Sequence, residues 1–194
     1  MPLSAGFSLI ELLVTMVIII ILATLYWSPN SGNRQSQLKT ACQKNLQKVY
    51  VAMEIYANEN AGRFPVAAGP RNSEQALDVL VPRYTSDTSA FICPGSRDGA
   101  LPAGESFLKG KISYAYYMGY GLADAQQVLM TDKQVDTQSK AVGQPLFSTT
   151  GKPPGNNHRK YGGNLLFCDG HIDMSPAQAP VSLVLTQGVV LLNP

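Results

Sequence analysis

Charged residues are scarce in this sequence of 194 residues: 15 are Lys or Arg and 13 are Asp or Glu, which leaves a net charge of +2. They form no acidic or basic tail, and no broad basic surface of the kind that binds nucleic acid is indicated. Repeats and low-complexity tracts are also missing. Length and composition therefore predict one small domain, rich in loops because it contains 17 Gly and 13 Pro, with no nucleic acid among its partners.

Motifs for catalysis are missing as well. The sequence has no glycine-rich phosphate loop, since Gly151-Lys152 is followed by Pro153 rather than by the Ser or Thr that binds magnesium. Cys168 with His158 or His171 could form a nucleophile and base, but no oxyanion-hole motif accompanies them. We therefore predict that the protein is not an enzyme. A metal-dependent enzyme is the alternative hypothesis.

A long apolar segment lies near the N-terminus. Residues 7–27 are almost wholly apolar, and Glu11 is the one charge. A helix of this length reaches about 30 Å, enough to cross a bilayer core, and Tyr26 and Trp27 stand where an aromatic belt is expected. Because apolar residues occur all around the helix, it requires lipid or complete burial.

The start of this segment carries a specific pattern, Gly6-Phe7-Ser8-Leu9-Ile10-Glu11-Leu12-Leu13. It resembles the processing site and helix start of type IV prepilins and type II secretion pseudopilins. The resemblance implies cleavage after Gly6, N-methylation of Phe7 as the new N-terminus, and a role for Glu11 as the assembly carboxylate. The Phe7 ammonium and the Glu11 carboxylate of a neighbouring subunit could then neutralise each other in a low-dielectric environment.

These features divide the chain into parts. Residues 1–6 are predicted as a leader peptide and residues 7–28 as a transmembrane and assembly helix. Helix breakers around Pro29 predict a break over residues 29–33. Residues 34–61 repeat apolar side chains every three or four positions, which predicts an amphipathic helix with Lys39, Lys44 and Lys48 mostly off its apolar face.

The remaining residues, 62–194, are predicted as a globular α+β domain. Ser73 is predicted as the N-cap of a short helix that ends near Leu80. Strands are predicted over residues 91–93, 112–118, 127–132, 164–168 and 171–174, the last two joined as a hairpin by a type I′ turn at Asp169-Gly170. Residues 181–192 are expected to add a last hairpin or helical turn.

Several stretches of this domain resemble the pseudopilin-like proteins of planctomycete, verrucomicrobial and related bacteria: Phe91-Ile92-Cys93-Pro94, Ser113-Tyr114-Ala115-Tyr116, and Gly163–Phe167 running into Asp169-Gly170-His171. The C-terminal signature of those proteins is a His, nine residues and Asp-Gly. Here ten residues separate His158 from Asp169-Gly170. The resemblance implies a pilin-like fold, in which a long N-terminal helix packs on a small antiparallel β-sheet.

The three cysteines are Cys42, Cys93 and Cys168. An exported domain favours disulfides, and we expect Cys93 to pair with Cys168 because both fall near predicted strands. The alternative is Cys42 with Cys93, since Cys42 faces the predicted core. One cysteine stays unpaired within the chain.

No cofactor is expected, although the sequence contains candidate ligands for zinc and for calcium. Zinc would use Cys168 and His171 across one hairpin, completed by Cys93 and His158. Calcium would use Asp169 and Asp173, but the dense Asp/Asn loop that binds calcium is absent.

The function that follows is that of a structural subunit of a type IV pilus-like or type II secretion pseudopilus filament. The precursor is expected to cross the inner membrane once, to be processed by a prepilin peptidase, and to be assembled by pilus or type II secretion machinery. The product would be a helical homo-oligomer, located as a periplasmic or extracellular filament. The alternative is a non-polymerising, single-pass, membrane-tethered binding module.

The charge distribution opposes this topology. Residues 1–6 contain no Lys or Arg, whereas Arg34, Lys39, Lys44 and Lys48 follow the apolar segment. By the positive-inside rule, the C-terminal domain would then lie in the cytoplasm. The prepilin-like motif is more specific than a charge count, so we expect an external domain.

Overall fold

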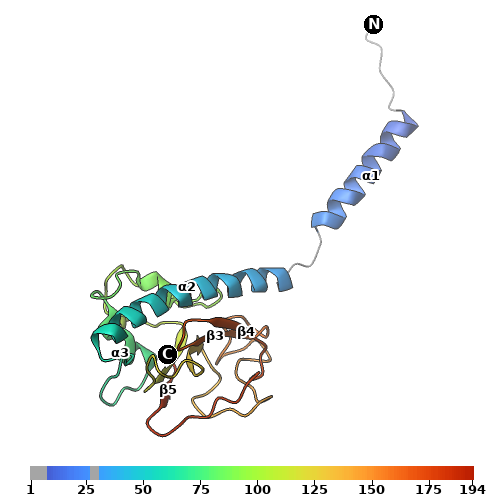
Figure 1. Cartoon of the computed structure of the whole chain (residues 1–194). Coiled ribbons are helices and arrows are strands. Elements are labelled where there is room, and N and C mark those ends of the chain that lie inside the picture. Colours follow the sequence, from blue (N-terminus) through green and yellow to red (C-terminus); the bar gives the residue numbers. More distant parts are fainter. Residues whose placement is uncertain (1–7, 27–30) are drawn as a thin grey trace. The chain divides into compact units, whose positions relative to one another are not determined.

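The computed structural model describes residues 8–26 and 31–194 of the chain (Figure 1). Its contacts divide the chain into two units, Met1–Asn33 and Arg34–Pro194. The first unit contains helix α1. The second contains an antiparallel sheet and most of helix α2, which confirms the predicted α+β fold.

Helix α1 spans Leu9–Tyr26. Its 18 residues give a length of about 27 Å, close to the thickness of a bilayer core. None of its side chains is buried. Its two threonines are satisfied inside the helix, because Thr15 Oγ1 donates to the Leu12 carbonyl and Thr24 Oγ1 to the Ile21 carbonyl, each at 2.8 Å. Within the described ranges, α1 is the one helix long and apolar enough to cross a membrane.

Helix α2 spans Ser31–Glu59. It begins before the predicted start at residue 34, so residues 31–33 of the predicted break are helical, while residues 29 and 30 lie outside the described residues. The helix ends just before the predicted end at residue 61. There Gly62, at φ +77°, donates its backbone N–H to the Ala57 carbonyl at 2.8 Å and closes the last turn.

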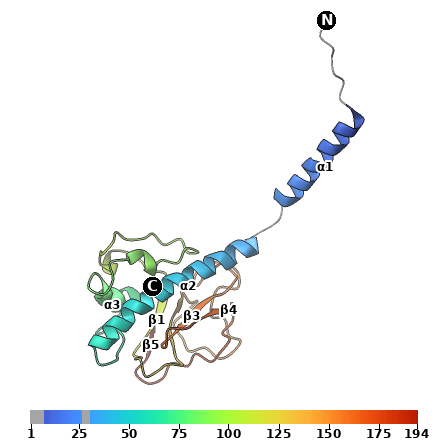
Figure 2. The same cartoon turned by 45° about the horizontal axis from the view of Figure 1, so that its top comes forward.

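Five strands form one antiparallel sheet in the order β4-β3-β2-β1-β5. Helix α2 lies across one face of this sheet (Figures 1 and 2). The strands are β1 (Tyr114–Met118), β2 (Val128–Asp132), β3 (Gly163–Phe167), β4 (Ile172–Ser175) and β5 (Val190–Leu192). The four strands predicted between residues 112 and 174 are confirmed, and the stretch 181–192 contributes the edge strand β5.

The strand predicted at residues 91–93 is wrong. The chain forms a short 3₁₀-helix there, η2 (Thr88–Phe91), in which Ala90 N–H bonds the Asp87 carbonyl. The Phe91 carbonyl accepts the Ser113 N–H at 2.9 Å, but residues 91–93 pair with no strand of the sheet, in which β1 pairs with β2 and β5. The other short helices are α3 (Ser73–Leu77), η1 (Asp78–Leu80) and η3 (Phe107–Lys109). The cap of α3 is Asn72 rather than the predicted Ser73.

The β3–β4 hairpin is confirmed, but its turn differs from the predicted type. A type I′ turn needs positive φ at both central residues, and Gly170, at φ +88°, is the only residue of this turn with positive φ. Gly170 N–H bonds the Phe167 carbonyl, and Phe167 N–H bonds the His171 carbonyl. The loop therefore has three residues, with glycine in the left-handed position at its end.

Strands β1, β2 and β3 are buried along their whole length. Helix α2 covers one face with Leu46, Val49 and Met53, and the loop residues Leu146, Phe147 and Leu183 join the same core. All of the tyrosines of residues 114–120 are buried as a result, although strand alternation alone predicts that half of them face the core.

Candidate functional site

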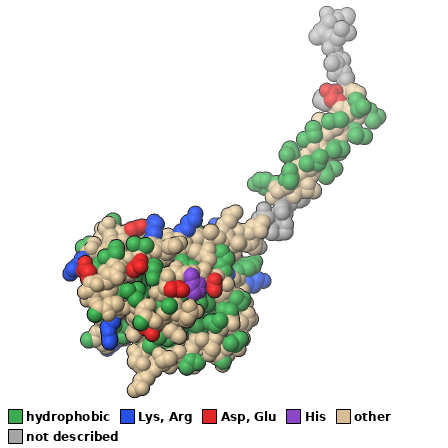
Figure 3. Space-filling view, viewed as in Figure 1, with side chains coloured by type: hydrophobic (Ala, Val, Ile, Leu, Met, Phe, Trp, Pro, Cys, Tyr) green, Lys and Arg blue, Asp and Glu red, His purple; other side chains and the backbone are tan. Residues whose placement is uncertain are grey.

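Helix α1 has no buried residue, and the face of it seen in Figure 3 is covered largely by apolar side chains. Its large side chains are all about half exposed or more, from Val17 at 47% to Tyr26 at 91%. An unpartnered surface of this kind is covered by lipid or by other protein. The first unit is therefore a candidate site for insertion and association.

Glu11 is the only charged residue of this helix. It stands in the first turn, where its backbone N–H bonds the Ser8 carbonyl at 3.0 Å. A carboxylate at this end is favoured by the helix dipole. The two predicted processing residues, Gly6 and Phe7, lie outside the described residues, so the structure adds nothing on their geometry.

A buried polar cluster occupies the interior of the second unit, and Asp132 at the end of β2 is its centre. Asn157 Nδ2 donates to Asp132 Oδ1 at 2.8 Å, and the backbone N–H and Nδ2 of Asn164 donate to Oδ2 at 2.8 and 3.0 Å. Asp132, Asn157 and Asn164 are at most 4% exposed. Three hydrogen bonds therefore compensate for the water that this carboxylate has lost.

His158 belongs to the same cluster and is fully buried. Its Nε2 lies 3.4 Å from Asp132 Oδ2 and 3.3 Å from Cys93 Sγ. Gly95 makes room for the ring, because a Cβ at that position would be 2.7 Å from His158 Nδ1. His158 is thus an interior residue that joins the loop before β3 to the Cys93 segment.

The disulfide joins Cys42 of α2 to Cys93, which corrects the expected pairing of Cys93 with Cys168 and agrees with the alternative. Cys168 is a buried free thiol. Asn164 touches Asp132 at one end of β3, whereas Cys168 follows the other end, about 13 Å further along an extended strand. Burial, together with Asp124 and Asp169, raises the pKa of the Cys168 thiol to about 12, so a nucleophilic role is disfavoured.

Lys39 also differs from the prediction. It was expected off the apolar face of its helix, but its side chain is buried. Its Nζ donates to the carbonyls of Tyr161 and Ser175 at 3.1 and 3.0 Å. Burial lowers the pKa of Lys39, and the nearby Asp132 carboxylate opposes that shift. The buried face of α2 therefore includes the Lys39 ammonium, which compensates for the buried Asp132 carboxylate.

The Asp169-Gly170 turn lies against α2. Tyr50 Oη donates to the Cys168 carbonyl at 3.0 Å, and a Cβ on Gly170 would come within 2.5 Å of the Tyr50 ring. His171 bonds Asp169 on the exposed turn. His158 and Asp169-Gly170 thus have separate structural roles: His158 lies in the core, and Asp169-Gly170 forms the turn that packs against α2.

The candidate zinc residues are only partly brought together. The His, Cys and acidic side chains of the described ranges include one group with ligand atoms all within 4.8 Å of one another, and it consists of Cys42, Cys93, Asp132 and His158. It contains Cys42 and Asp132 in place of the predicted Cys168 and His171. Asp132 was missed from the sequence, although its position at the end of a strand that begins Val128-Leu129-Met130 was a signal that its carboxylate is buried.

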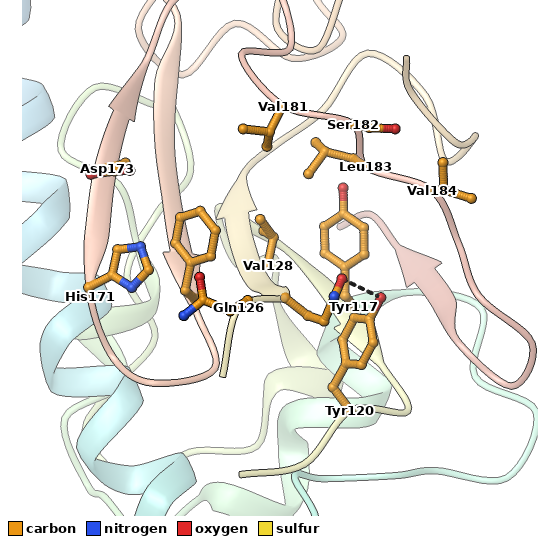
Figure 4. A pocket seen from close by; sticks show the side chains of 12 residues that line it. Tyr117, Tyr120, Gln126, Val128, His171, Asp173, Val181, Ser182, Leu183 and Val184 are labelled. Carbon is orange, nitrogen blue, oxygen red and sulfur yellow. Dashed lines mark hydrogen bonds between the residues drawn. The ribbon is translucent and has the colours of Figure 1, made fainter. Parts of the chain in front are cut away.

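His171 and Asp173 instead line an open groove of about 370 Å³ (Figure 4). The rings of Phe167 and His171 stack at 4.0 Å between centroids, and Tyr120 Oη donates to Gln127 Oε1 at 3.4 Å. Asp173 is exposed. Neither Asp169 nor Asp173, the candidate calcium ligands, belongs to the group formed by Cys42, Cys93, Asp132 and His158.

Comparison with protein families places a known motif on the first unit. The model of the prokaryotic N-terminal methylation motif matches residues 1–26. Comparison with curated proteins found no match, and neither did comparison with solved structures. The chain therefore carries the N-terminal signal of a type IV pilin-like, prepilin-type protein, and α1 is consistent with single-pass membrane anchoring.

Proposed function

We propose that the protein is a structural subunit of a type IV pilus-like or type II secretion pseudopilus filament. The precursor is cleaved after Gly6 by a prepilin peptidase and N-methylated at Phe7. Subunits then polymerise through α1, and the second unit forms the outer part of a periplasmic or extracellular filament. The resemblance of residues 91–94, 113–116 and 163–167 supports a subunit of the pseudopilin-like kind found in planctomycetes and related bacteria, although ten residues rather than nine separate His158 from Asp169-Gly170.

The observation that carries the proposal is the combination of the methylation motif with a helix that has no buried side chain and a single charge. An isolated helix of this composition is stable in lipid, and in a filament it would be covered by copies of itself. The helix dipole favours a carboxylate in the first turn in either environment, so the methylation motif is what favours a filament subunit over a plain membrane anchor.

Glu11 supplies the specificity of this association. A carboxylate inside a membrane helix costs about 2.5–3.5 kcal/mol at the centre and less near the end. A neighbouring Phe7 ammonium would offset that cost, and a misaligned neighbour would not. The charge pair thereby selects the axial register of one subunit against the next.

The first experiment is intact-mass and N-terminal analysis of the protein from its native membrane or from sheared filaments. A chain that begins with methylated Phe7 is expected. An uncut N-terminus, together with monomers in detergent, would instead establish the alternative, a non-polymerising membrane-tethered binding module.

The second experiment tests the Glu11 carboxylate. Glu11→Ala should process normally but yield at least about tenfold less sheared filament, because it leaves the Phe7 ammonium unpaired in an apolar environment. Glu11→Gln, which keeps the size of the side chain, should fail to the same extent. Glu54→Ala, which removes an exposed carboxylate from α2, is the matched control and should assemble normally. Normal assembly of Glu11→Ala would refute the role of Glu11.

A further inference from the structure

We propose that the second unit has a zinc site that forms when its disulfide is reduced. The four ligands are the buried side chains of Cys42, Cys93, Asp132 and His158. The site is independent of the filament proposal, which rests on residues of the first unit.

The distances between the ligand atoms suit zinc. Zinc in proteins is tetrahedral, with bonds of about 2.0–2.1 Å to nitrogen or oxygen and about 2.3 Å to sulfur, so its ligand atoms lie about 3.3–3.8 Å apart. His158 Nε2 is 3.3 Å from Cys93 Sγ and 3.4 Å from Asp132 Oδ2. Two edges of the tetrahedron are therefore already formed, and the main movement required is separation of the two sulfurs after reduction.

The ligands come from four separate elements that are each fixed in place. Cys42 lies in α2, Cys93 follows η2, Asp132 ends β2, and His158 precedes β3. All four are buried, so the site excludes water. Two thiolates, an imidazole and a carboxylate form a mixed soft and borderline donor set that suits zinc better than magnesium or calcium.

The surroundings orient the ligands in the way that metal sites require. Asn157 and Asn164 hold both oxygens of Asp132, and ligating carboxylates are commonly hydrogen-bonded in this manner. Gly95 N–H donates to Cys93 Sγ at 3.3 Å, which stabilises a thiolate at that sulfur.

Charge is balanced in both redox states. In the disulfide form, the Lys39 ammonium compensates for the Asp132 carboxylate, and the electrostatic interaction between them is favourable. In the zinc form, the negative charges of two thiolates and Asp132 are matched by Zn²⁺ together with Lys39. The charges of Lys39, the four ligands and zinc therefore sum to zero in either state, so zinc entry leaves no uncompensated ion in this cluster.

The redox step is a two-electron exchange. A dithiol reductant breaks the Cys42–Cys93 bond, becomes a disulfide itself, and leaves two thiols on the protein. Zn²⁺ then displaces both thiol protons and forms two Zn–S bonds. A disulfide oxidant reverses the sequence, removes two electrons and releases Zn²⁺.

The test uses the full chain in detergent, reduced anaerobically with a water-soluble phosphine, which becomes a phosphine oxide with oxygen from water. After incubation with Zn²⁺ and gel filtration, reduced protein should retain about one zinc per chain and oxidised protein almost none. Co²⁺ in place of Zn²⁺ should give sulfur-to-metal charge-transfer absorption, at about half the intensity in Cys42→Ala.

Substitutions assign the ligands. His158→Ala should bind zinc about 100-fold more weakly, whereas Cys168→Ala, which removes the remaining thiol, should bind as the wild type does. Retention of no more zinc by reduced than by oxidised wild-type protein would overturn the proposal, and so would loss of zinc from Cys168→Ala. The comparison of zinc retention by reduced and by oxidised wild-type protein needs no substitution, so it tests the proposal even if His158→Ala fails to fold.

Discussion

At the scale of single residues, Glu74 shows how a buried carboxyl group can weaken a fold. The residue is 3% exposed, and its Oε1 accepts the Ile112 N–H at 3.2 Å. Its Oε2 has no hydrogen-bond partner within the described ranges. Burial raises the pKa of Glu74, while the backbone N–H groups of Glu74 and Ile112 oppose the shift. The folded state therefore favours the protonated form.

The consequence is a pH-dependent loss of stability. Above pH 4.5 the unfolded chain releases this proton more readily than the folded chain, so the free energy of unfolding falls as the pH rises through the folded pKa. Glu74→Gln should remove this loss, and the difference between variant and wild type should grow with pH by at most about 1.4 kcal/mol per unit. Denaturant titrations from pH 4 to 8 would measure it. A constant difference would show that burial of the charge costs nothing.

At the scale of elements, the β3–β4 turn docks against α2 through Gly170. Gly170 and Gly188 have the same φ of +88°, but a Cβ on Gly170 would approach the Tyr50 ring to 2.5 Å, and a Cβ on Gly188 would meet nothing within 4 Å. Substitution of Gly188 would therefore cause backbone strain alone, whereas substitution of Gly170 would cause the same strain and a steric clash with Tyr50.

Gly170→Ala should therefore destabilise the fold more than Gly188→Ala does. Left-handed backbone costs about 1–2 kcal/mol in either variant, and overpacking against Tyr50 should add about 1–3 kcal/mol in Gly170→Ala alone. Chemical denaturation of the two variants side by side would show the difference. Equal losses would mean that α2 shifts freely away from the turn and that the contact with Tyr50 is not tight.

At the scale of the whole molecule, the disulfide ties α2 to the body of the second unit. It closes a loop with a sequence separation of 51, for which the entropy of the unfolded chain predicts a stabilisation of about 4 kcal/mol. Reduction in the presence of a metal chelator should lower the free energy of unfolding by about that amount. Cys168→Ala, which leaves the disulfide intact, should not change the effect of reduction.

The measurement is denaturation of oxidised and reduced protein, followed by near-ultraviolet circular dichroism of the buried tyrosines. Without the chelator, zinc should recover part of the lost stability in the reduced protein, because an ion that binds only the folded state stabilises it. Equal stability of the oxidised and reduced forms in chelator would show that packing alone holds α2 on the sheet.

The sequence by itself determined the features that depend on neighbouring residues. Helix α1 follows from an unbroken apolar run, and the prominence of Glu11 follows from its being the only charge in that run. Strands β1 to β4 follow from local alternation and from the turn residues Asp169-Gly170. These signals are local because helix and strand periodicity are read over a few consecutive positions.

Tertiary structure alone decided which distant residues meet. The strand order β4-β3-β2-β1-β5 places the end of β2 beside the start of β3, so Asp132 meets Asn164 and His158 in the core. Lys39 was predicted off the apolar face of its helix, but its Nζ is buried against the carbonyls of Tyr161 and Ser175, which are distant in the sequence. The partner of Cys93 likewise depended on how α2 crosses the sheet, because a disulfide requires proximity in space and spacing along the chain does not report it.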